Sequence, residues 1–173
     1  MTSFASSRFS LARAAILACF LAIGGAGWQQ AFAAAGPFAD FPGSWEGNGK
    51  INIGPKSERI RCKATYSLKD NDESYVLIQI TCASDSYKFD LAGDFEADST
   101  NAINGTWSET SRGVGGSASG TAKGDRFQLH FQSTAITGNM VMTTKRNNQT
   151  VTIDTIGTKD KISASITLRR AAR

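Results

Sequence analysis

The stretch ERIRCKATYSLKDNDESYVLIQITCASDSYKFDL, residues 58–91, has the pattern of a β-hairpin whose two arms can be joined by a disulfide. A polar loop, Asp70–Ser74, separates two arms in which apolar and polar residues alternate. Cys62 and Cys82 are equally distant from Asp72, the middle residue of this loop. The register that pairs them also sets apolar residues opposite each other on the same face: Ala64 with Ile80, Tyr66 with Ile78, and Leu68 with Val76.

The N-terminal segment has the features of a secretory signal peptide. Residues 1–13 carry Arg8 and Arg13 but no acid, residues 14–23 are apolar, and a small-residue run ends at Ala33. We therefore expect residues 1–33 to be a signal peptide cleaved near Ala33, which predicts a periplasmic or secreted protein. Glycines interrupt the apolar run before it reaches the roughly 18–20 residues of a membrane span, so we expect no membrane span in the mature chain.

Two cysteines remain after this cleavage, because Cys19 belongs to the predicted signal peptide. An even number of cysteines in an exported chain, facing each other across a hairpin, predicts a disulfide bond between Cys62 and Cys82. Cross-linking a loop of this length should stabilise the folded protein by about 3 kcal/mol.

The length and charge of the mature chain limit its organisation and its partners. Cleavage leaves 140 of 173 residues, the size of one domain. We expect residues 34–42 to be a proline-interrupted lead-in segment and residues 43–170 to form a single domain. Loss of Arg8 and Arg13 lowers the formal net charge from +4 to +2, which argues against nucleic acid as a partner.

Alternation of apolar and polar residues at period two continues through most of residues 43–170. In residues 43–53 the inward face includes Gly47 and Gly49, which indicates a sharp bend or the close approach of another backbone. Residues 113–124 are small and rich in glycine and serine, and their alternation predicts a narrow pair of strands.

The fold class that follows is all-β. No mature segment has apolar residues at helical spacing over the length of a helix, and the turn signals separate about eight to ten short strands. This pattern predicts an antiparallel meander closed into a small barrel, with a β-sandwich as the alternative. Closure is favoured because it removes the open edges of the sheet.

The run Gly43-Ser44-Trp45 at the start of the first strand resembles the opening of the calycins, the group of lipocalins, fatty-acid-binding proteins and avidins. Gly105-Thr106-Trp107 repeats the motif and is similar to avidin-type and related small barrels, although the biotin-binding pattern of polar residues and further tryptophans is absent. The resemblance implies a calycin-like barrel.

A second resemblance covers most of the mature chain and is to a group of small exported proteins of alphaproteobacteria. It implies a bacterial envelope protein, and it carries no functional residues because no activity is assigned to that group. The runs that carry it are Pro42–Gly47, Arg59–Cys62 with Tyr66, Cys82–Tyr87 and Gly105–Glu109.

Four inward-facing residues are the candidate ligand contacts: Trp45, Tyr66, Trp107 and Glu109. The indoles of Trp45 and Trp107 would contact an apolar or amphipathic molecule inside the barrel. Glu109 shares the face of Trp107, so it could hold the polar end of a ligand at the barrel mouth, or reach solvent at the end of its strand. Large side chains that fill the interior would leave no room for a ligand.

Arg59, Arg61 and Lys63 form a row on the outward face of the first hairpin arm. Such a row could contact anions such as an envelope lipid or an acidic glycan. It could also be a solvated face that discourages pairing between sheets.

We predict no catalytic residues, no metal and no cofactor. His130, the one histidine of the chain, points away from the apolar face of its strand, and most acids lie in turns or on solvent faces, where their pKa values have little reason to move. The function predicted from sequence is therefore a periplasmic β-barrel binding module for a small apolar or amphipathic ligand, and not an enzyme. The alternative is a structural or inhibitory envelope protein that acts through its outer basic surface.

Overall fold

The computed structural model describes residues 35–156 and 161–172, and the predicted signal peptide with Cys19 lies outside these residues. The described residues are almost entirely β-structure, with one short 3-10 turn at Lys69–Asn71. The strands are β1 Gly43–Ile53, β2 Lys56–Leu68, β3 Tyr75–Ala83, β4 Lys88–Ala97, β5 Ala102–Glu109, β6 Val114–Lys123, β7 Arg126–Gln132, β8 Thr137–Lys145, β9 Asn148–Ile156 and β10 Ile162–Arg170.

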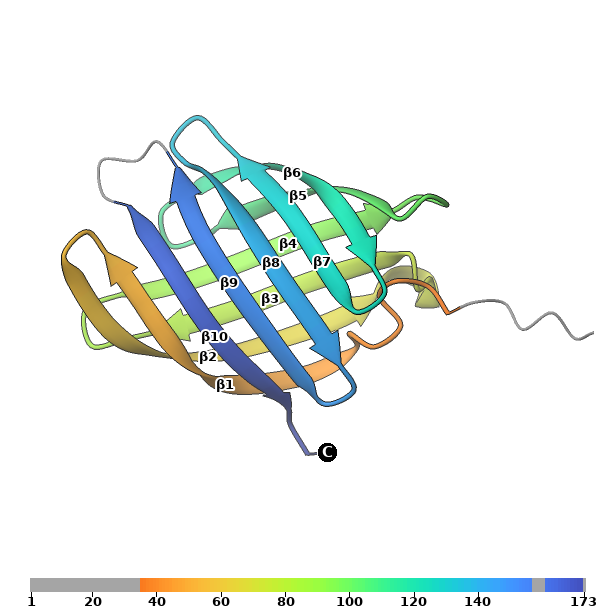
Figure 1. Cartoon of the computed structure of the whole chain (residues 1–173), viewed down its shortest axis with the longest axis horizontal. Coiled ribbons are helices and arrows are strands. Elements are labelled where there is room, and N and C mark those ends of the chain that lie inside the picture. Colours follow the sequence, from red (N-terminus) through yellow and green to blue (C-terminus); the bar gives the residue numbers. More distant parts are fainter. Residues whose placement is uncertain (1–34, 157–160, 173) are drawn as a thin grey trace, which may run out of the picture. The chain divides into compact units, whose positions relative to one another are not determined.

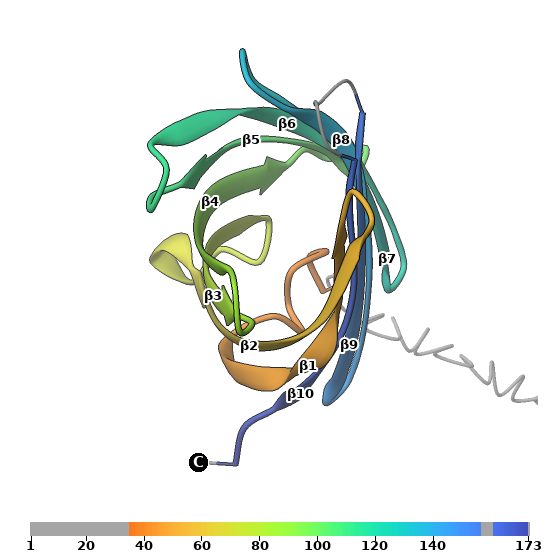
Figure 2. The ribbon, with the colours of Figure 1, turned by 90° about the vertical axis from the view of Figure 1, so that its left-hand side faces the viewer.

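The ten strands form one closed antiparallel barrel. Each strand pairs with its neighbours in sequence, and β1 also pairs with β10 to close the ring. In Figure 1, strands β7–β10 cross in front of β2–β4, and Figure 2 shows β1–β5 curving round to face the flatter wall of β8–β10. The predicted barrel is confirmed, and the sandwich alternative is wrong because the sheet has no open edges.

The predicted hairpin register is also confirmed. Between β2 and β3 the pairs are Ala64 with Ile80, Tyr66 with Ile78, and Leu68 with Val76. Cys62 lies opposite Cys82, and the two form a disulfide bond. The local alternation pattern therefore placed every inward side chain of this hairpin on the correct face.

Close backbone approach, one of the two explanations for the inward glycines of β1, is what the structure shows. A Cβ atom on Gly47 would lie 1.9 Å from the carbonyl oxygen of Thr167, and one on Gly49 would lie 2.3 Å from that of Ser165. Any side chain there would push β10 away from β1. Glycine at these positions is therefore required by the seam that closes the barrel.

The small-residue segment of residues 113–124 differs from its prediction. It forms one strand, β6, and not a narrow pair, and β6 pairs with β5 along one edge and with β7 along the other. Gly113 and Gly124 have positive φ angles and turn the chain at the two ends of this strand. The chain therefore turns before and after the small-residue run and not within it. The run itself is one strand of the meander.

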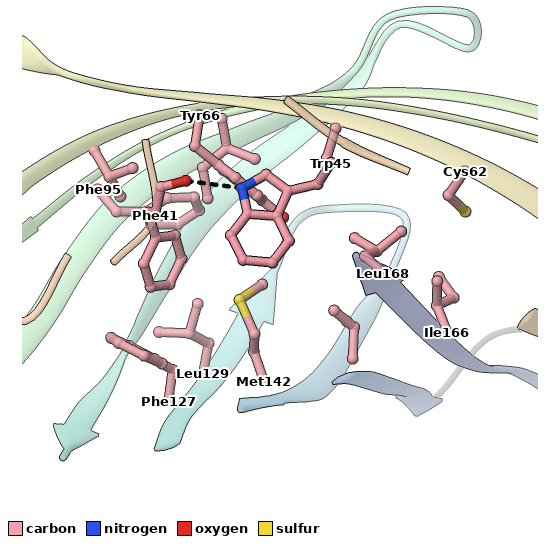
Figure 3. Packing of buried hydrophobic residues seen from close by; sticks show 14 of the residues in the cluster. Phe41, Trp45, Cys62, Tyr66, Phe95, Phe127, Leu129, Met142, Ile166 and Leu168 are labelled. Carbon is pink, nitrogen blue, oxygen red and sulfur yellow. Dashed lines mark hydrogen bonds between the residues drawn. The ribbon is translucent and has the colours of Figure 1, made fainter. Parts of the chain in front are cut away.

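One end of the barrel is filled by residues that precede β1. The segment before β1 forms no strand, as expected of a lead-in, but its Phe38 and Phe41 are buried in the core. Figure 2 shows this orange segment curling inside the ring of strands. Trp45 Nε1 donates a hydrogen bond to the carbonyl oxygen of Phe41 at 2.9 Å, drawn in Figure 3.

Candidate functional site

The opposite end of the barrel contains a cavity of about 390 Å³. Its wall is almost entirely apolar and receives side chains from all ten strands. Several of these side chains point inward and yet stay only half-buried, as expected for residues that face an unfilled space. They are Ile80, Phe89, Trp107, Phe131, Met140, Ile153 and Ile162.

Two aromatic side chains, from the strands on either side of β6, give the cavity an apolar surface. The rings of Trp107 and Phe131 meet edge to face, with centroids 5.7 Å apart. Trp107 Nε1 donates a hydrogen bond to the carbonyl oxygen of Ser117 at 3.2 Å. Because this bond occupies its one polar atom, the indole offers an apolar contact to the cavity.

Glu109, at the end of β5, is the buried acid of the cavity wall. Its Oε1 accepts hydrogen bonds from the backbone N of Asp90 at 2.9 Å and from the backbone N and Oγ of Ser111. Burial alone would raise the pKa of Glu109, but these bonds and the nearby charge of Arg112 hold the net pKa below its ordinary value. Glu109 is therefore a carboxylate at neutral pH.

Arg112 is the cation that faces this carboxylate, and it also lines the cavity. Its Nη1 lies 3.4 Å from Glu109 Oε2 and donates a hydrogen bond to the carbonyl oxygen of Lys88 at 3.2 Å. Its guanidinium carbon lies 4.6 Å from the centroid of the Phe89 ring. These contacts hold the turn between β5 and β6 against the start of β4 at the cavity mouth.

The structure separates the four candidate ligand residues into two pairs. Trp107 and Glu109 line the cavity. Trp45 and Tyr66 lie at the filled end, with exposed fractions of 1% and 2%, and do not line it. The expectation that one molecule contacts both Trp45 and Trp107 therefore does not fit this arrangement, because Trp45 and Trp107 lie towards opposite ends of the barrel.

Tyr66 belongs to a buried polar chain within the filled end. Its hydroxyl donates to Gln149 Oε1 at 2.7 Å, and Gln149 Nε2 donates to Thr144 Oγ1 at 2.9 Å. Burial raises the pKa of Tyr66, and the hydrogen bond to Gln149 opposes this only in part. These bonds satisfy the buried polar atoms, so this end is a packed core.

The basic row lies where its sequence pattern placed it, on the exposed outer face of β2. Across the β1–β2 pairing, Lys63 lies opposite Glu46, Arg61 opposite Asn48 and Arg59 opposite Lys50. None of the ion pairs between described residues involves these three side chains. The contact of this row with an anion remains a prediction.

Other candidate chemistry lies away from the cavity. His130 is exposed on the outer face of β7, with Nδ1 3.0 Å from Asn139 Oδ1. Within residues 35–156 and 161–172, no group of three or more histidine, cysteine, aspartate or glutamate side chains could hold a metal ion. The same residues contain no helix long and apolar enough to cross a membrane.

Comparisons with known proteins show the fold of this chain. No protein-family model and no curated protein sequence matches it. The structure is similar to the S-type phycobiliprotein lyase CPES from Guillardia theta, with a TM-score of 0.60 and 11% identity over 79% of this chain and 91% of that one. It is also similar to Rv2717c from M. tuberculosis, with a TM-score of 0.61 and 12% identity over 78% and 94% of the two chains. At these identities the two likenesses show a shared fold and nothing more.

Sequence reasoning missed one feature of the site and one of the opposite end of the barrel. Arg112 follows the inward Glu109 by three residues, and this spacing could have indicated a pair across a turn, but the turn's geometry was needed to bring Arg112 to the cavity. Phe38 and Phe41 belong to the predicted lead-in segment, and the structure buries both in the core. Two phenylalanines within four residues were the available signal for their burial.

Proposed function

We propose that this protein binds one small apolar or amphipathic molecule in the 390 Å³ cavity between Trp107, Phe131 and the inner face of β8–β10. The observation that supports the proposal is the almost entirely apolar cavity at one end of the barrel. The other end holds the buried rings of Phe38 and Phe41, beside a second recess of about 310 Å³ with a more polar wall. The volume lies within the roughly 300–1,000 Å³ of typical ligand pockets, and the wall combines aromatic surface with few polar groups. A phycobiliprotein lyase shares the fold, which supports a functional barrel but, at this identity, no particular substrate.

We further propose binding without covalent catalysis. The lowered pKa of Glu109 makes it a poor general acid or base near neutral pH, and His130 lies on the outer face. The signal-peptide pattern of residues 1–33 and the Cys62–Cys82 disulfide support an exported protein of the bacterial envelope.

Fluorescence of N-phenyl-1-naphthylamine, a neutral apolar dye, tests the cavity directly. Ala164 on β10 lines the cavity, while the next residue, Ser165, points outward and is exposed. We expect the protein to bind the dye with a rise in fluorescence, and Ala164→Phe to weaken binding at least about tenfold by filling the cavity. Ser165→Phe adds the same ring on the outer face of the same strand and should leave binding unchanged.

Equal binding by both variants would place the dye outside the cavity and contradict the proposal. The unfolding temperature of each variant, measured without dye, distinguishes a filled cavity from a disturbed barrel. Absence of dye binding to the unaltered protein would instead favour the alternative, in which the outer row of Arg59, Arg61 and Lys63 is the contact surface.

A further inference from the structure

We infer that the ligand of this cavity carries a carboxylate, and that Arg112 binds it at the mouth; this inference rests on the proposed function. The wall of the cavity is apolar apart from a few groups, among which Glu109 and Arg112 are charged. The sequence offers Glu109 as one candidate for the polar end of a ligand, or as a side chain that reaches solvent, and the geometry favours Arg112 for that contact.

Glu109 is held by the protein through one of its two carboxylate oxygens. Its Oε1 accepts three hydrogen bonds from Asp90 and Ser111, while its Oε2 lies 3.4 Å from Arg112 Nη1 and has no hydrogen-bond partner among the described residues. Because Oε2 is buried, a ligand group cannot reach it unless a neighbouring side chain moves. The hydrogen bonds also keep this carboxylate ionised, so it balances one charge within the site and offers little to an incoming ligand.

Arg112, unlike Glu109, is partly exposed and has hydrogen-bond donors that no described residue uses. Its side chain is 46% exposed, and Nη1 alone makes its contacts with Glu109 and Lys88. Among the described residues, Nε and Nη2 of Arg112 have no hydrogen-bond partner. These two nitrogens form one edge of the planar guanidinium, on the side away from Nη1.

This free edge fits a carboxylate better than other polar ends. Two parallel N–H donors match the two oxygens of a carboxylate, which gives a bidentate, charge-assisted contact. A hydroxyl can accept only one such bond at a time, and an ammonium group would be repelled. The stack of Arg112 on the Phe89 ring and the bond to Lys88 fix the plane of the guanidinium before a ligand arrives, which lowers the entropic cost of binding.

The size of the cavity sets the rest of the ligand. A volume of 390 Å³ is near the lower limit for ligand pockets, so it suits a single apolar chain or a compact ring system and not a two-chain lipid. With the carboxylate at Arg112, the apolar part would lie against Trp107 and Phe131. The inferred ligand class is therefore a small monocarboxylic acid with an apolar body.

Displacement of the bound dye by three ten-carbon molecules, decanoate, 1-decanol and decylammonium, tests the inference. We expect decanoate to displace N-phenyl-1-naphthylamine at about tenfold lower concentration than 1-decanol, as a charge-assisted pair of hydrogen bonds implies. Decylammonium should be the weakest of the three. A preference for 1-decanol or decylammonium in the unaltered protein would overturn the inference, whatever the variants do.

Arg112→Gln and Lys88→Gln form a matched pair of variants. Both remove one positive charge from the same region, but Lys88 is paired with Asp90 and does not line the cavity. Arg112→Gln should abolish the preference for decanoate while keeping 1-decanol binding, and Lys88→Gln should keep the preference. Arg112→Lys retains the positive charge but lacks the two parallel N–H donors, so it should keep only part of the preference for decanoate.

Equal loss of the preference in Arg112→Gln and Lys88→Gln would show a general charge effect and contradict a direct contact. The proposed cavity itself would be contradicted if none of the three molecules displaced the dye and if Ala164→Phe and Ser165→Phe bound the dye equally well. Displacement by all three at similar concentrations would retain the cavity and overturn only the role of Arg112.

Discussion

The two ends of the barrel are built from the same ten strands and differ in what fills them. At one end the rings of Phe38, Phe41 and Phe127 pack against one another, with Phe41 4.9 Å from Phe127 between centroids. The Tyr66 ring packs against both Phe41 and Trp45. At the other end aromatic side chains line a cavity of about 390 Å³. Aromatic content alone therefore does not determine whether a small barrel is filled.

The difference comes from the segment that precedes β1. The guanidinium of Arg170 donates hydrogen bonds to the carbonyl oxygens of Asp40 and Pro42, and the backbone N of Phe38 bonds to the carbonyl oxygen of Glu73 at 3.0 Å. These bonds fix the segment so that Phe38 and Phe41 enter one end. Among the described residues no comparable segment enters the other end, so its inward side chains stay half-buried.

Truncation of one phenylalanine at each end gives the largest expected contrast. Phe41→Ala removes a ring that is 2% exposed and should lower the free energy of unfolding by about 3–5 kcal/mol. Phe131→Ala removes the same atoms from a half-buried site and should cost less than half as much. Urea denaturation of both variants measures the difference, and similar losses would contradict the assignment of filled and unfilled ends.

The disulfide should have the next largest effect. Replacing both Cys62 and Cys82 by alanine removes a cross-link between residues 20 apart in sequence, which should cost about 3 kcal/mol. The β2–β3 pairing lies along the barrel wall, so the fold should survive. Cys82 also lines the cavity, so dye binding cannot serve as an unchanged reference in this variant. Denaturation with and without a reductant measures this cost in the unaltered protein.

Mass spectrometry of the protein without reductant provides the matching control. Two free thiols on Cys62 and Cys82 would contradict the bond. Complete loss of folded protein in the double variant would show that the barrel depends on the cross-link more than a single domain of this size should.

Acid should affect the open end through Glu109, and this is the smallest effect. A carboxyl group whose pKa is lowered on folding stabilises the protein above its unfolded pKa, near 4.5, and loses this contribution as the pH falls through the lower folded pKa. Stability measured from about pH 7 to about pH 3 should therefore fall less steeply in Glu109→Gln than in the unaltered protein.

Part of the fall will remain in the variant, because Asp72, Asp90 and Asp98 also have lowered pKa values through hydrogen bonds to neighbouring residues. The buried polar chain of the filled end does not take part, because Tyr66 stays neutral in acid and Gln149 and Thr144 do not titrate. Parallel pH profiles for Glu109→Gln and the unaltered protein would show that Glu109 does not contribute to acid sensitivity.

The sequence by itself determined the features that depend on neighbours along the chain or across one hairpin. The period-two pattern placed Tyr66, Trp107 and Glu109 on the inward face, because side chains in a strand alternate strictly between its two faces. Symmetry about Asp72 fixed the register of β2 and β3 and with it the Cys62–Cys82 bond. The number of strands and the lack of helical periodicity were sufficient to predict an all-β fold.

Only the tertiary structure decided which inward residues share a space. Trp45 and Trp107 both point inward. Alternation cannot show that Trp45 is hydrogen-bonded to Phe41 in the core while Trp107 lines a cavity. Their surroundings depend on residues far away in sequence, such as Arg170, which bonds to the segment before β1. Arg112 became a candidate for the same reason, because a turn brought its guanidinium over the ring of Phe89, a contact that no spacing within the sequence specifies.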